Sequence, residues 1–242
     1  QELAKMIQAQ GAVFGTYAEG AYTKFLQSGH PALVTAQQFA GWTQKALSKK
    51  MIKEMNQLYG SFPGKYMATD DGKLAVARLQ FGNVALLPQV MAGVGGDSFK
   101  IVHDTDQAPP YTYVASYLWA RYGFSADALI HFGTHGSLEY TPRKQVALGS
   151  NDWSDRLIGV VPHFYIYTIG IVGEAMIAKR RTYAQTQSYL TPPFKESELR
   201  QTYKQLSDAI QSYEKKATAE QSLKVKALTV KMGIARELGL DA

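Results

Sequence analysis

Residues 127–144, which read DALIHFGTHGSLEYTPRK, determine how the rest of the chain is interpreted. The stretch begins with an apolar strand pattern that runs into His131, and a glycine-rich turn with His135 and then Glu139 follows. In α/β proteins, functional side chains commonly lie on the loop that follows a strand. After the turn we expect either a helix, which places side chains four apart on one face, or a folded loop. Both geometries allow His131, His135 and Glu139 to converge.

The spacing of the two histidines leaves two interpretations open. A metalloprotease helix needs a glutamate directly after the first histidine, and Phe132 occupies that position, so the sequence excludes this class. One remaining interpretation is a metal site or an acid–base site. The other is a pair of hydrogen-bonded histidines in a strand-to-helix turn, followed by a solvated Glu139.

The composition is that of an ordinary folded protein. The chain has 242 residues, of which 45% are hydrophobic and 19% charged, enough for one large or two small domains and too apolar for disorder. No apolar run approaches the roughly 18 residues that a membrane-spanning helix needs. The absence of cysteine excludes disulfides and thiolate metal sites. The net charge of +6 comes from dispersed basic residues without a nucleic-acid motif, so we expect a solvated surface with one local anion site.

The order of strand and helix patterns predicts an α/β fold in three segments. Residues 1–64 are expected to be helical, because apolar positions recur three or four apart and Thr35 begins a capping box. Residues 65–195 are expected to form a mostly parallel, helix-covered sheet that carries the site. Residues 196–242 are expected to form a pair of helices. In the central segment the patterns predict strands at 74–87, 99–102, 127–133, 146–148 and 163–168, and helices at 110–122 and 173–189.

Other polar residues near these strands receive weaker assignments. His103 and Asp104 follow the predicted strand 99–102, and in a parallel sheet they would emerge at the same edge as His131. His163 opens the strand pattern HFYIYT, where the apolar alternation favours a packing role. Residues 93–97, GVGGD, lack the features of a phosphate-binding loop or a dinucleotide fingerprint, so we exclude nucleotide binding there.

Several motifs in order resemble the large, porphyrin-binding subunit of the magnesium and cobalt chelatases. They are FGNVALLPQ, HFGTHGSLEY, PRKQVALG and AKRRTYAQTQSYLTPP, within residues 35–194. The resemblance implies a tetrapyrrole substrate and a divalent metal as second substrate, which would be cobalt or alternatively iron or magnesium. It also implies AAA-type ATPase and accessory partner subunits, which would supply any ATP hydrolysis. Because large subunits of this family are several times longer and this chain begins at Gln1 without a leader, we expect a segment of a longer protein.

Metal insertion into a tetrapyrrole needs a loosely held metal and a base for the two pyrrole N–H protons. Read with the resemblance, His131 and His135 are expected to bind the incoming metal or to act at the ring face. Glu139 would be a metal ligand or a proton acceptor, and Glu174 a second carboxylate. For Glu174 the alternative is a carboxylate that simply stabilises the start of its helix through the helix dipole.

The reaction also needs basic groups that bind the ring carboxylates. The resemblance implies this role for Lys144, Arg180 and Arg181, with His103 as a weaker candidate. A solvated surface position is the alternative for Lys144 and Arg181.

Two departures from the family pattern leave the substrate open. The family's Pro-Gly-Lys stands here as Pro142-Arg143-Lys144, and an Asn/Asp-rich turn before Glu174 is replaced by glycine and apolar residues. The main interpretation is cobalt insertion into a corrin ring, with ATPase partners, in the cytoplasm. One alternative is a haem dechelatase-type homologue that removes iron from haem during haem uptake at the cell envelope. Another is a porphyrin-binding module without chemistry of its own.

Overall fold

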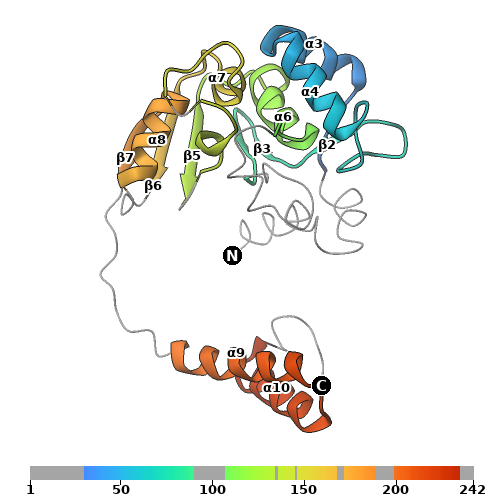
Figure 1. The fold of residues 1–242 in the computed structure, drawn as a ribbon, viewed down its shortest axis with the longest axis vertical. Coiled ribbons are helices and arrows are strands. Elements are labelled where there is room, and N and C mark those ends of the chain that lie inside the picture. The colour runs from blue at the N-terminus through green and yellow to red at the C-terminus, as the bar shows by residue number, and fades with distance from the viewer. Residues whose placement is uncertain are drawn as a thin grey trace. The chain divides into compact units, whose positions relative to one another are not determined.

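The structure is a computed structural model that describes residues 30–89, 107–133, 136–144, 146–167, 172–188 and 199–234. It consists of two compact units, Gln1–Thr191 and Pro192–Ala242 (Figure 1). The predicted strand 99–102, His103, Asp104, the glycine-rich residues 93–97 and His135 lie outside the described residues.

The first described part of the larger unit combines two helices with a short sheet. Helix α3 (Ala36–Ala46) begins at the predicted capping box, in which the Gln38 amide N–H donates to the Thr35 hydroxyl over 3.2 Å. Helix α4 (Lys49–Tyr59) follows directly and ends at Gly60. Strand β1 (Ala32–Val34) pairs antiparallel with β2 (Leu74–Val76). This pairing joins the segment before α3 to the segment after α4. A three-residue strand such as β1 is too short to show an alternation, so the sequence predicted only helix here.

The predicted extended stretch 74–87 and the helix after it are confirmed. Strands β3 (Leu79–Phe81) and β4 (Val84–Leu86) form a hairpin around a tight turn at Gly82. Helix α6 (Tyr111–Leu118) starts directly after Pro110, and all eight of its residues are buried. A single π-helical turn, Trp119–Gly123, continues it. The hydrophobic core lies around α6 and joins it to α3, α4, β2 and α7 (Trp153–Ile158).

The central sheet confirms the predicted α/β class. Strands β5 (Leu129–Gly133), β6 (His163–Tyr167) and β7 (Gln185–Ser188) run parallel in the order β5-β6-β7. In this register His131 lies beside Tyr165. Helix α8 (Val172–Thr182) connects β6 to β7 and packs on the sheet through the buried Ala178 (Figure 1).

Two details of the central segment were predicted wrongly. The helix expected to reach residue 189 ends at Thr182, because Tyr183 has a positive φ of 55°, and the polar sequence QTQS then forms β7. The strand expected at 146–148 is an irregular loop in which Ala147 has a φ of 54°. The buried Asp152 carboxylate holds this loop by accepting the amide N–H groups of Lys144 and Gly149.

The smaller unit contains the predicted helical pair. Helices α9 (Leu199–Lys215) and α10 (Ala219–Lys231) pack against each other. The Thr218 hydroxyl caps the start of α10 by accepting the amide N–H of Gln221. Within the described parts of both units, no helix has the length and apolar character needed to cross a membrane.

Candidate functional site

The central sheet presents a row of polar aromatic and imidazole side chains on one face. Alternate residues of a strand point to opposite faces, so His131 of β5 shares a face with its neighbour Tyr165 and with the other members of that alternation on β6, His163 and Tyr167. All four side chains are buried. On the opposite face Phe132 is 75% exposed. Helix α8 packs against the covered face, which therefore holds the two buried imidazoles and the two buried phenols.

Two glutamates meet on this face at a single tyrosine hydroxyl. Glu139 lies in the 3₁₀ turn Leu138–Tyr140, and Glu174 lies in the first turn of α8. The Tyr165 Oη atom is 2.5 Å from Glu139 Oε1 and 2.6 Å from Glu174 Oε1. The Gly136 amide N–H donates to both Tyr165 Oη and Glu174 Oε1 over 3.1 Å. We call Glu139, Glu174, Tyr165 and the Gly136 amide the carboxyl cluster.

The carboxyl cluster must hold more than one mobile hydrogen. A phenol carries a single hydrogen, yet Tyr165 makes two short oxygen–oxygen contacts, so one of the carboxyls carries the second hydrogen. The Gly136 amide N–H donates to Glu174 Oε1 and not to Glu139. Burial raises the pKa of Glu139 to about 7, and the Glu174 charge adds to that effect. Glu139 is therefore the protonated partner, and its buried Oε2 has no hydrogen-bond partner among the described residues.

The second glycine of the HFGTHG motif is required by close approach. A Cβ atom on Gly136 would lie 2.5 Å from Glu139 Oε1 and 2.8 Å from a ring carbon of Tyr165. Real Cβ atoms do not come this close to their neighbours, so a larger residue here would displace the Glu139 carboxyl.

Arg181 holds the 3₁₀ turn through its backbone. The Arg181 side chain is 1% exposed, and its terminal nitrogens donate to the backbone carbonyl oxygens of Glu139 and, over 2.6 Å, Thr141. Burial lowers the pKa of this guanidinium, although the nearby Asp152 and Glu139 oppose that effect. To contact a ring carboxylate, Arg181 would have to give up these bonds. The other two expected carboxylate-binding residues, Lys144 and Arg180, are exposed.

His131 belongs to a second buried group. Its Nε2 atom lies 3.0 Å from the Tyr117 hydroxyl, and its Nδ1 atom lies 2.8 Å from His163 Nε2. The Nδ1 atom of His163 is 3.0 Å from the Thr182 carbonyl oxygen. We call these four groups the histidine chain. Burial lowers the pKa of His131 to about 3, with the neighbouring His163 contributing, and burial lowers the pKa of His163 as well. Both imidazoles are therefore neutral at physiological pH.

The expected ligand set of His131, His135 and Glu139 remains a prediction, because His135 lies outside the described residues. No cluster of three His, Asp or Glu side chains suited to a metal occurs in the described part of the chain. Sequence reasoning did not identify Tyr165 and Tyr117, and it favoured packing for His163. The alternation in HFYIYT, which places residues 163 and 165 on one face, was the signal that could have identified two of them.

A largely apolar cavity of about 290 Å³ adjoins the histidine chain at His131. Its wall comes from the β3–β4 hairpin, the residues after it, and β5 and β6; the lining residues are Leu79, Ala85, Leu86, Leu87, Pro88, Gln89, Ile130, His131, Phe132 and Tyr167. The ring of Tyr167 stacks on that of Tyr165, with centroids 3.8 Å apart and an interplanar angle of 19°. The cavity is thus one aromatic ring away from the carboxyl cluster and includes His131 in its wall.

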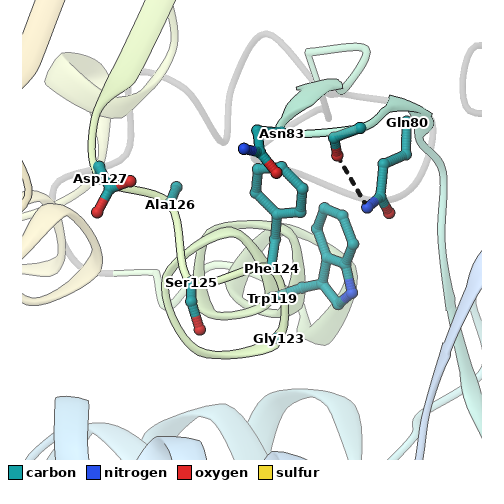
Figure 2. A pocket seen from close by; sticks show the side chains of 9 residues that line it. Gln80, Asn83, Trp119, Gly123, Phe124, Ser125, Ala126 and Asp127 are labelled. Carbon is teal, nitrogen blue, oxygen red and sulfur yellow. Dashed lines mark hydrogen bonds between the residues drawn. The ribbon is translucent and has the colours of Figure 1, made fainter.

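A second cavity, of about 360 Å³, lies beside the π-helical turn (Figure 2). Figure 2 shows the stacked rings of Trp119 and Phe124, with Gln80 and Asn83 from the hairpin above them. Among the described residues, its lining includes no histidine and no glutamate, and Asp127 is the one carboxylate there. It shares no residue with the carboxyl cluster or the histidine chain, so we assign it no part in their chemistry.

Comparisons with known proteins identify the family of the chain. The family model described as CobN/Magnesium Chelatase matches residues 1–242. A magnesium-chelatase subunit of Rhodobacter capsulatus is 40% identical over 163 residues, which are 67% of this chain and 13% of that protein. Aerobic cobaltochelatase subunit CobN of Pseudomonas aeruginosa is 40% identical over 128 residues, which are 53% of this chain and 10% of that protein. The matched region is thus a small part of the length of these relatives. The chain belongs to the CobN/Magnesium Chelatase family.

Proposed function

We propose that this chain is the part of a chelatase large subunit that receives protons from a tetrapyrrole while a divalent metal is inserted. The observation that carries the proposal is the carboxyl cluster, in which Glu139 and Glu174 share the Tyr165 hydroxyl close to an apolar cavity. Its relatives, which are named as subunits of magnesium chelatase and of aerobic cobaltochelatase, support the reaction class.

The carboxyl cluster has the properties of a proton acceptor at neutral pH. Proton transfer is most efficient when the pKa of the acceptor lies near the working pH, and the pKa of Glu139 is about 7. Metal insertion displaces two pyrrole protons. Glu139 accepts a proton only in its ionised form, which a pKa of about 7 makes available near neutral pH, and it must pass that proton on before it accepts another, so we expect the two protons to leave in separate steps.

The imidazole of His131 suits the metal better than it suits the protons. A pKa of about 3 makes His131 a poor base at neutral pH, but its neutral ring keeps a lone pair. Imidazole favours first-row transition metals, whereas magnesium favours carboxylate and water ligands. We therefore propose cobalt, inserted into a corrin ring with AAA-type ATPase partner subunits, and we assign His131 to the metal and Glu139 and Glu174 to the protons. Lys144 and Arg180, both exposed, are proposed to bind ring carboxylates.

Iron removal from haem is the second candidate function. It runs the same proton transfers in reverse and needs a carboxyl that is protonated at neutral pH, which the buried Glu139 provides. It would need no ATPase partner.

The test uses the full-length parent protein under anaerobic conditions. Cobalt insertion into a corrin is followed by absorbance with ATPase partners and ATP, and release of metal-free porphyrin from haem is followed by fluorescence without them. We expect Glu139→Gln and Tyr165→Phe to lower kcat at least tenfold with little change in ring binding. Glu214→Gln, the same chemical change at an exposed position of α9, is the control. Ring binding without metal exchange under either condition would favour a non-catalytic porphyrin-binding module.

A further inference from the structure

The histidine chain permits only one arrangement of hydrogens when both rings are neutral. The Thr182 carbonyl oxygen can only accept, so His163 Nδ1, 3.0 Å away, must carry a hydrogen. The remaining nitrogen of a neutral His163, Nε2, then has a lone pair, and it lies 2.8 Å from His131 Nδ1. His131 Nδ1 must therefore carry the hydrogen of this second bond.

The state of the other nitrogen of His131 follows directly. Its Nε2 has a lone pair, which accepts the hydroxyl hydrogen of Tyr117 over 3.0 Å. The Tyr117 hydroxyl also interacts with the side chain of Gln89, which lines the apolar cavity together with His131. His131 thus forms part of the cavity wall, and its Nε2 lone pair is occupied by a hydroxyl that belongs to a separate helix, α6.

We propose that His163 is a positioning residue that fixes His131 in the Nδ1–H tautomer and so reserves the His131 Nε2 lone pair for a divalent cation. The cation would take the place of the Tyr117 hydroxyl hydrogen bond. Histidines that bind metals commonly donate the hydrogen of their other ring nitrogen to a fixed acceptor, which sets the tautomer and the ring orientation. Here the acceptor is a second imidazole, which is itself held by the backbone carbonyl of Thr182 at the end of α8.

The proposal takes its purpose from the proposed function, but the tautomer can be measured without turnover. Nuclear magnetic resonance of this chain, labelled with ¹⁵N in its histidines, shows which ring nitrogens carry hydrogen. The His131 signals are identified by their loss in His131→Gln. We expect hydrogen on Nδ1 and none on Nε2 at pH 7.5. Hydrogen on Nε2, or on both nitrogens, would overturn the inference.

Three variants separate the contributions of the two neighbours of His131. His163→Gln keeps an oxygen that can accept from His131 and an amide that can donate to Thr182, so the Nδ1–H tautomer should persist. His163→Leu removes the acceptor, and the hydrogen should move to Nε2, where Tyr117 can accept it. Tyr117→Phe should leave the tautomer unchanged. An unchanged tautomer in His163→Leu, or a changed one in Tyr117→Phe, would contradict the assignment. If His163→Leu does not fold, the wild-type and Tyr117→Phe spectra decide.

Zinc alone serves as the diamagnetic metal probe. In the wild-type chain and in His163→Gln, added zinc should shift the His131 Nε2 signal, and His163→Leu should weaken this binding by about 10–100-fold. An Nε2 signal that zinc leaves unmoved in every variant would refute the reserved lone pair. The expected tautomer together with full turnover of Glu139→Gln in the parent protein would contradict the proposed function and leave this inference intact.

Discussion

Replacing Glu139 by glutamine should change how the stability of the larger unit depends on pH. Glu139 is fully buried, and burial raises its pKa from 4.5 to about 7. Between these two pH values the folded protein keeps a proton that the unfolded chain has lost, so the free energy of unfolding falls as the pH rises. The stabilisation is complete below pH 4.5 and is lost by about pH 7. A shift of this size corresponds to about 3 kcal/mol.

His131 acts in the opposite direction. Its pKa falls from 6.5 to about 3 on burial, so in this pH range the unfolded chain holds a proton that the folded protein lacks. Its contribution to the free energy of unfolding is present above pH 6.5 and is lost as the pH falls towards 3. The two slopes oppose each other between pH 4.5 and 6.5. Burial also lowers the pKa of His163, which adds to the His131 slope. The pH dependence of the free energy of unfolding of the wild-type protein in this range is therefore the difference of opposing slopes, and the Glu139 contribution cannot be read from it directly.

The variant Glu139→Gln removes the Glu139 contribution, so the difference between variant and wild type shows that contribution alone. Its free energy of unfolding, relative to wild type, should rise by about 3 kcal/mol between about pH 4.5 and 7.5. The assay is urea unfolding followed by tryptophan fluorescence, because the three tryptophans all lie in the larger unit and report on it alone. Glu214→Gln in the smaller unit is the control. A difference between variant and wild type that is the same at every pH would show that Glu139 ionises normally, and the assignment of Glu139 as the protonated partner would then fail.

Three further variants and one control test individual contacts in the larger unit by the same urea assay. Gly136→Ala should destabilise the larger unit by about 2 kcal/mol, because the new Cβ atom would overlap the Glu139 carboxyl; Gly41→Ala, in helix α3 with open space around it, should instead stabilise by about 0.5–1 kcal/mol. Arg143→Gly should relieve the strain of a φ of 90° but lose the ion pair with the α4 carboxylate and the bond to the Asn151 carbonyl; we expect a net loss of about 1 kcal/mol, and a gain would show that strain outweighs the contacts. Arg181→Lys should cost about 1–3 kcal/mol, because lysine cannot reproduce the two backbone bonds; a change within experimental error would contradict its role in holding the turn.

The sequence predicted the elements whose local signal was strong. The capping box at Thr35, the helix after Pro110 and the strand that carries His131 all occur where their patterns placed them. Strand β7 could not be predicted in this way, because its polar sequence QTQS has no apolar alternation. The loop at residues 146–148 contains three apolar residues that read as a strand. Asp152, several residues further on, holds it as a loop, and a local pattern cannot contain that interaction.

The sequence predicted several residues of the candidate site, but not which of them hydrogen-bond to one another. The sequence identified His131, Glu139 and Glu174, and the structure buries all three on or beside one face of the central sheet. It could not show that Glu139 and Glu174 share a partner, because Tyr165 reaches them only after β5, β6 and α8 have come together. The intervals of four left a helical face and a folded loop both open, and among the described residues after the turn the structure forms the 3₁₀ turn Leu138–Tyr140 at Glu139.

Strand β6 gives a physical reason why the metal and the protons need not compete in the proposed reaction. His163 and Tyr165 lie two residues apart on one face of this strand, which separates their backbones by roughly 7 Å. His163 holds His131, whose low pKa keeps its lone pair free of protons. Tyr165 holds the two glutamates, whose shared hydrogens can be exchanged near neutral pH. A cation would therefore bind a neutral His131 imidazole, with no proton to displace from its Nε2 atom. Protons would go to a separate pair of carboxyls on the same rigid strand, and a single-site base could not keep these two tasks apart.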